Sequence, residues 1–130
     1  VVPELDLLNL PPDLDARMQA AIVDEFGDVE DAEVARYIHS WSPYQNVKDG
    51  VVYPAMFLLS GMLDRNCPPS NSRKFAARMD EANAGARPIH LRVWRDVGHM
   101  VVEPQVFARY HAEWLAFVMD QLAMKAEVAH

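Results

Sequence analysis

The chain has 130 residues, of which 51% are hydrophobic and 24% charged, and its formal net charge is −7 at pH 7. This length suits one domain, and the apolar share is large enough for a core, which excludes wholesale disorder. No apolar run approaches the roughly 18 residues that a membrane span needs. The acidic balance argues against nucleic acid as a partner, because phosphate binding needs clustered positive charge. We therefore expect residues 1–130 to belong to one folded domain.

The spacing of apolar residues predicts three strands and four helices. In chain order these are a strand at Val1–Leu8, a helix from Leu14 to Phe26, a helix between Asp28–Asp31 and Pro43, a strand at Val51–Ser60, a helix capped by Ser70 and ended by Gly85, a strand at Pro88–Trp94, and a helix that starts at Pro104. Strands that are joined by crossover helices run parallel, so the predicted fold class is α/β. Three strands make a thin sheet with an apolar edge. We expect further sequence, or a partner chain along the first strand, to continue this sheet.

The chain opens with Val1-Val2-Pro3 and shows none of the basic and apolar leader of a signal peptide. The lack of such a pattern favours a cytoplasmic location for the protein. The missing initiator Met predicts that the protein begins further upstream. The single cysteine, Cys67, excludes an internal disulfide and a cysteine-rich zinc site.

Two side chains with acid–base chemistry follow neighbouring predicted strands. Asp64 lies in the loop after the Val51–Ser60 strand, and His99 lies in the loop after the Pro88–Trp94 strand. The carboxyl ends of parallel strands gather the active groups of open sheets, so these two loops can meet. A carboxylate that orients an imidazole base forms two-thirds of a Ser-His-Asp triad, and α/β-hydrolases place the acid before the histidine. On spacing alone, however, both residues could equally be ordinary loop residues, with Asp64 as a turn former.

Several short segments, together with Asp64, follow the pattern of one family. They are Glu25-Phe26-Gly27-Asp28, Ser42-Pro43-Tyr44-Gln45-Asn46-Val47, Tyr53-Pro54-Ala55, Leu58-Leu59-Ser60-Gly61, Ser72-Arg73-Lys74-Phe75-Ala76-Ala77-Arg78 and Gly98-His99. From about Val1 to about Met119, the chain resembles the C-terminal portion of the catalytic domain in the prolyl oligopeptidase family of serine peptidases.

The resemblance implies a partial α/β-hydrolase domain that hydrolyses short peptides without a metal or an organic cofactor. Asp64 and His99 would be the acid and base of the triad, with the remainder of the hydrolase domain as their partner. The family has a substrate-binding arginine where this chain has Asn66, and Arg65 stands one residue earlier. We expect Arg65 and Asn66 to contact the substrate, which leaves the preference for proline open.

The nucleophile of such an enzyme sits in a G-x-S-x-G elbow. None of the serines Ser40, Ser42, Ser60, Ser70 and Ser72 is flanked by glycines in this way. We therefore expect this chain to be inactive alone, with the serine supplied from upstream.

Other interpretations remain open. The chain could belong to an ester hydrolase of the same fold, because fold and triad do not fix the substrate. It could also be a non-catalytic module that pairs with a partner chain. Cys67 as nucleophile is disfavoured, since a lone cysteine is more often a small buried hydrophobe. The remaining histidines show no metal-ligand spacing, and the acids of Asp28–Asp31 fit a helix start better than a calcium loop.

Overall fold

The computed structural model describes residues 4–12 and 14–124. The chain divides into two compact units, Val1–His99 and Met100–His130. In chain order the first unit holds α1 (Ala16–Phe26), α2 (Ala32–Trp41), β1 (Met56–Gly61), α3 (Pro69–Ala82) and β2 (Ile89–Trp94), and the second holds α4 (Pro104–Gln121). Within the described ranges, no helix is both long enough and apolar enough to cross a membrane.

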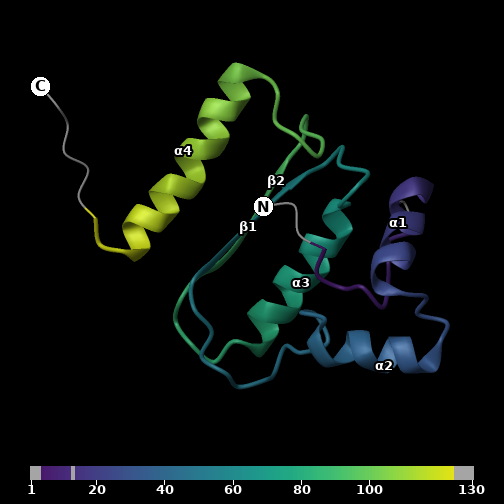
Figure 1. Cartoon of the computed structure of the whole chain (residues 1–130). Helices are drawn as coiled ribbons and strands as arrows, with labels where there is room; N and C mark the ends of the chain where they lie inside the picture. The colour runs from purple at the N-terminus through teal and green to yellow at the C-terminus, as the bar shows by residue number, and fades with distance from the viewer. Residues whose placement is uncertain (1–3, 13, 125–130) are drawn as a thin grey trace, which may run out of the picture. The chain divides into compact units, whose positions relative to one another are not determined.

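Strands β1 and β2 pair in parallel, with Met56 opposite Ile89 and Gly61 opposite Trp94. Helix α3 connects them and packs on both strands, and α1 and α2 lie beyond α3 (Figure 1). This arrangement confirms the predicted α/β class and the crossover. It also brings the loops that follow β1 and β2 to the same edge of the sheet.

The predicted strand at Val1–Leu8 is wrong over the residues that the structure describes, which begin at Glu4. Residues 4–8 contain no strand, so the described sheet has two strands rather than three. The Leu5 N–H donates instead to the side-chain oxygen of Asn71, at 3.1 Å, and the Leu5 carbonyl accepts from the Tyr44 N–H, at 2.8 Å. These tertiary bonds replace a sheet ladder. Residues Val1–Pro3 lie outside the described part.

Local capping chemistry sets the ends of the helices. The Asp31 carboxylate caps α2 by accepting from the N–H groups of Glu33 and Val34, which confirms that the acidic segment starts a helix. Gly27 follows α1 with φ +96°, a conformation that favours glycine, as predicted. Ser70 is not a cap, because α3 already begins at Pro69. Proline suits this first helical position, since its missing N–H needs no partner there.

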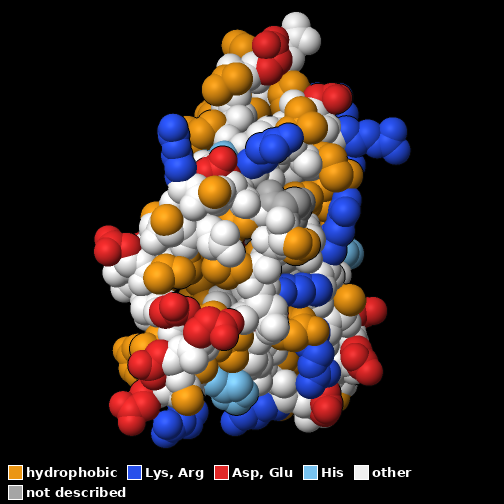
Figure 2. Space-filling view, turned by 90° about the vertical axis from the view of Figure 1, so that its right-hand side faces the viewer, with side chains coloured by type: hydrophobic (Ala, Val, Ile, Leu, Met, Phe, Trp, Pro, Cys, Tyr) orange, Lys and Arg blue, Asp and Glu red, His pale blue; other side chains and the backbone are white. Residues whose placement is uncertain are grey.

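The first unit contains two hydrophobic clusters. The buried members are Leu7, Leu14, Ile22 and Ile38 in one cluster, and Val47, Phe75, Met79 and Ala82 in the other. On the face seen in Figure 2, basic, acidic and hydrophobic side chains are interspersed.

An ion pair between a buried carboxylate and a partly exposed lysine ties the opening segment to α3. The Asp6 side chain is 1% exposed, and its Oδ2 lies 2.6 Å from Nζ of Lys74. Its Oδ1 accepts from the Gln45 amide at 2.6 Å and from the Asn9 backbone at 3.2 Å. Burial by itself raises the pKa of Asp6, but the bonds from Lys74, Gln45 and Asn9 outweigh burial and hold this pKa below its usual value.

Replacing Lys74 with Met should therefore destabilise the protein by about 1–3 kcal/mol at pH 7, because Asp6 stays buried without its cation. The lowered pKa means that the stabilisation from the pair is present above the unfolded-state pKa of Asp6 and is lost as pH falls through the folded-state pKa. Urea unfolding measures this effect. The free energy of unfolding should be lower for K74M than for the wild type at pH 7, and this difference should be smaller at pH 3. Lys48→Met, at an exposed position, is the control. Equal stability of K74M and K48M at pH 7 would contradict this account.

Candidate active site

The loops that follow β1 and β2 are held against each other through their backbones. The Leu63 N–H donates to the Val97 carbonyl at 2.9 Å. Gly61 permits this approach, since a Cβ at that position would lie 2.3 Å from the Val97 carbonyl oxygen and 2.5 Å from that of Gly98. A residue without a side chain is thus required where the two loops meet.

This contact brings Asp64 and His99 together, as the sequence predicts. Nδ1 of His99 lies 3.1 Å from Oδ2 and 3.3 Å from Oδ1 of Asp64. The Asp64 side chain is 0% exposed, whereas that of His99 is 37% exposed. The backbone N–H groups of Asn66 and Cys67 both donate to Oδ1 of Asp64 at 2.9 Å. A buried carboxylate, held by its own loop, thus faces a partly exposed imidazole.

This pair has the chemistry of an oriented general base. A hydrogen bond from Nδ1–H to the carboxylate leaves the other ring nitrogen, Nε2, unprotonated and able to accept a proton. When Nε2 takes up that proton, the negative charge of Asp64 stabilises the resulting imidazolium.

Cys67 lies beside the pair, and its thiol is a poor nucleophile. Its sulfur lies within 4.8 Å of the ligand atoms of Asp64 and His99. Burial, followed by the charges of Glu4 and Asp64, raises the pKa of the thiol to about 12. At neutral pH the thiol keeps its proton, whereas both nucleophilic attack and metal binding need the thiolate. Asp64 and His99 are moreover already bonded to each other, so the geometry favours an acid–base pair over a metal centre.

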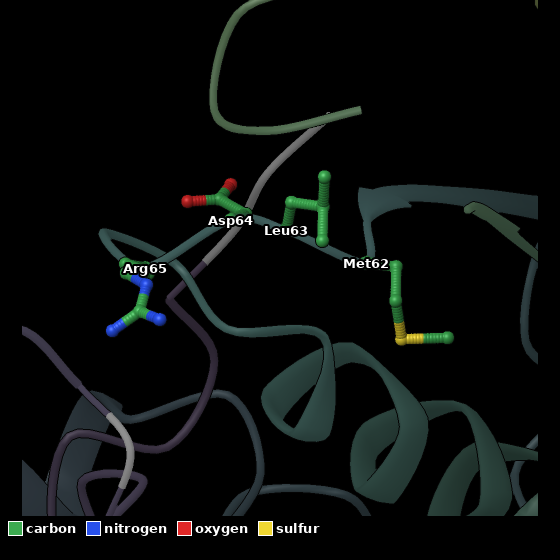
Figure 3. Close-up of a pocket in the computed structure, with 4 residues that line it drawn as sticks. All are labelled: Met62, Leu63, Asp64 and Arg65. Atoms are coloured by element: carbon green, nitrogen blue, oxygen red, sulfur yellow. The ribbon is translucent and has the colours of Figure 1, made fainter. Parts of the chain in front are cut away.

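Arg65 and Asn66, the predicted substrate contacts, face different hollows. Arg65 lines a hollow with a volume of about 210 Å³, together with Met62, Leu63 and Asp64. In Figure 3 the side chains of Leu63 and Asp64 point to one side of the loop, while those of Met62 and Arg65 point to the other. The Arg65 guanidinium is thus directed away from the Asp64 carboxylate.

Asn66 lines a larger hollow, of about 370 Å³, together with the first turns of α1. The α1 side of this hollow consists of Asp15, Arg17, Met18 and Ala21. The Asp15 N–H donates to the Arg65 carbonyl at 3.1 Å, which fixes the start of α1 against the loop that carries Asp64. Sequence reasoning missed this contribution of α1, because no local pattern relates it to a loop so distant in the chain.

Comparison with known proteins places this chain in a family. The model of the prolyl oligopeptidase family matches residues 2–125. The chain is 30% identical to a dipeptidyl aminopeptidase BI of Pseudoxanthomonas mexicana over 129 residues, which cover 98% of this chain and 18% of that protein. It is 28% identical to a prolyl endopeptidase of Elizabethkingia miricola over 103 residues, which cover 78% of this chain and 15% of that protein. The chain thus spans less than a fifth of the length of these relatives.

Solved structures show the same fold. Oligopeptidase B of Leishmania major superimposes with a TM-score of 0.81 at 22% identity, over 94% of this chain and 17% of that one. An esterase of Thermogutta terrifontis superimposes with a TM-score of 0.57 at 19% identity, over 98% of this chain and 42% of that one. The fold is therefore part of an α/β-hydrolase domain, as predicted. With the match over residues 2–125, the chain belongs to the prolyl oligopeptidase family.

Proposed function

We propose that this chain supplies the acid and the base of a serine peptidase that hydrolyses short peptides. The observation that carries the proposal is the 3.1 Å contact between Nδ1 of His99 and the buried carboxylate of Asp64. The family supports it, since the named relatives are peptidases. The remainder of the hydrolase domain is the partner that contributes the nucleophilic serine.

In the first step, Nε2 of His99 takes the proton of the serine hydroxyl as the serine oxygen attacks the carbonyl carbon of the peptide. The imidazolium then gives this proton to the leaving amine when the C–N bond breaks. In the second step His99 takes a proton from a water molecule as the water oxygen bonds to the acyl carbon, and the imidazolium returns this proton to the serine oxygen when its bond to the acyl group breaks. Throughout, Asp64 keeps its negative charge and stabilises the imidazolium.

Asn66 is the better candidate of the two for contact with the substrate. It lines the larger hollow and is bonded through its own N–H to Asp64, whereas the Arg65 side chain points to the opposite side of the loop from Asp64 (Figure 3). The Asn66 amide can donate to a substrate carbonyl but brings no positive charge, unlike a guanidinium. Recognition of the substrate therefore rests on neutral hydrogen bonds at this position.

An ester hydrolase is the second candidate function. It is favoured by the neutral Asn66 at a position where the resemblance calls for an arginine, because an ester carbonyl needs no cationic contact. The same catalytic pair would serve either reaction.

Turnover of two substrates by the complete protein separates these functions. A peptidase should hydrolyse a short peptide, either unlabelled or as a peptide anilide with proline beside the scissile bond, and also a simple ester, since the ester is the easier acyl donor. An ester hydrolase should turn over the ester alone. If the complete protein cleaves the ester but no anilide or unlabelled short peptide, the peptidase proposal is wrong; if it cleaves neither substrate class, a non-catalytic binding module becomes the better account.

A further inference from the structure

The hollow between Asn66 and the start of α1 lies close to the Asp64–His99 pair. Its volume of about 370 Å³ is enough for an amino-acid side chain or a chain end. Oδ1 of Asp64 accepts from the Asn66 N–H at 2.9 Å and lies 3.3 Å from Nδ1 of His99. The Asn66 backbone is therefore no more than two such contacts away from the imidazole. By distance, a substrate residue a few positions from the bond that is cut beside His99 can reach this hollow.

Arg17 brings an uncommitted positive charge to the hollow. It is an exposed residue in the first turn of α1, and it lines the hollow with Met18 and Ala21. Its backbone N–H donates to Oδ1 of Asp15 at 2.9 Å. Its guanidinium, in contrast, has no hydrogen-bond or ion-pair partner among the residues that the structure describes. The hollow thus contains five N–H donors on one planar cation that are available to a ligand.

Asp15 is the acidic residue of the hollow, and its carboxylate already has a structural role. It is the N-cap of α1, where it accepts from the Arg17 N–H. The Asp15 N–H in turn donates to the Arg65 carbonyl at 3.1 Å, so the start of α1 is held against the loop that carries Asn66. Capping therefore occupies the acid and fixes the helix that presents the guanidinium.

We propose that Arg17 is a specificity-determining residue that binds a carboxylate of the substrate in this hollow. The inference rests on the proposed function, because it names the class of short peptide that the peptidase prefers. A guanidinium can donate two parallel hydrogen bonds to one carboxylate, whereas it gains less from a neutral amide. An acidic side chain and the C-terminal carboxylate of a short peptide offer the same group.

Matched pairs of peptide substrates test this preference in the complete protein. One pair differs by Glu against Gln at a position near the scissile bond, and a second pair by a free against an amidated C-terminus. For the pair whose carboxylate reaches Arg17, kcat/KM should be about 3–10-fold higher for the acidic member. The pair that shows the difference distinguishes a side-chain carboxylate from a chain end.

Variants of Arg17 show whether the guanidinium causes the preference. Arg17→Gln should remove it, chiefly through a higher KM for the acidic peptide, because Arg17 does not touch the reacting atoms. Arg17→Lys should retain part of it, and Arg17→Glu should reverse it. Arg36→Gln is the matched control, since Arg36 is an exposed arginine of α2 that does not line the hollow. R36Q should keep the wild-type preference.

Calorimetric titration of the same peptides into the complete protein with His99→Ala gives a readout that needs no hydrolysis. The acidic member of the pair should bind about 3–10-fold more tightly than the neutral one. Addition of R17Q to H99A should make the two dissociation constants equal.

The two readouts separate failure of this inference from failure of the proposed function. An active enzyme that shows no preference for the acidic peptide, or one that keeps its preference in R17Q, overturns the role of Arg17 and leaves the peptidase intact. If the wild type hydrolyses no peptide, the proposed function fails and calorimetry decides for Arg17. Tighter binding of the acidic peptide that R17Q abolishes then supports the carboxylate site, and equal binding or no binding of the two peptides overturns it.

Discussion

Replacing Asp64 with Asn in the complete protein should lower kcat for peptide hydrolysis by about 10⁴-fold and leave KM little changed. The amide is close in shape to the carboxylate, and its oxygen can still accept from the Asn66 and Cys67 N–H groups. Its NH₂ group, however, favours an unprotonated Nδ1 on His99 and thus the wrong tautomer of the ring. It also removes the charge that stabilises the imidazolium.

Steady-state kinetics on a peptide anilide measure this effect, with Asp96→Asn as the matched control. Asp96 lies exposed in the same loop as His99, so its substitution makes the same change of charge without touching the pair. D96N should keep wild-type kcat. A D64N enzyme that retains more than about a tenth of wild-type kcat would show that Asp64 does not orient the base.

Replacing Gly61 with Ala should both destabilise the protein and impair catalysis. The new Cβ would lie 2.3 Å from the Val97 carbonyl oxygen, 2.5 Å from that of Gly98 and 2.8 Å from the Val97 carbonyl carbon. All three are backbone atoms, so no side chain can turn away and the two loops must separate. We expect a loss of about 1–3 kcal/mol in the free energy of unfolding. Displacement of His99 from Asp64 by about 1 Å should lower kcat roughly 10²-fold.

Gly98→Ala is the internal control for this prediction. A Cβ at Gly98 would meet only the Leu63 carbonyl oxygen, at 3.8 Å, which is an ordinary contact. G98A should therefore keep wild-type kcat and stability although it lies next to His99. Comparable losses in G61A and G98A would mean that the close approach of the two loops at Gly61 does not control the site.

The sequence predicts the elements whose causes are local. Gly27 ends α1 and the acids up to Asp31 start α2, because each acts on the backbone beside it. The meeting of Asp64 and His99 was also predictable, since it follows from the order of a parallel strand–helix–strand unit. That their contact is catalytic remains a prediction.

The sequence is less informative where distant residues decide the structure. The segment that begins at Glu4 is apolar enough for a strand, but its backbone bonds to Asn71 and Tyr44 instead. Short apolar runs are ambiguous in this way, because tertiary contacts select their conformation. The available signals were Glu4 and Asp6, two acids within an apolar stretch. The need for glycine at position 61 likewise depends on Val97, which only the folded chain brings near.

Covalent labelling of the complete protein with a fluorophosphonate tests the central claim most directly. Such a probe reacts with a serine hydroxyl that a neighbouring base activates, and mass spectrometry identifies the labelled residue. We expect one serine, contributed by the remainder of the hydrolase domain, to be labelled in the wild type and its labelling to be lost in His99→Ala. Labelling that is undiminished in H99A, or the absence of any labelled serine in the folded protein, would contradict the assignment of Asp64 and His99 as the acid and base of a serine peptidase.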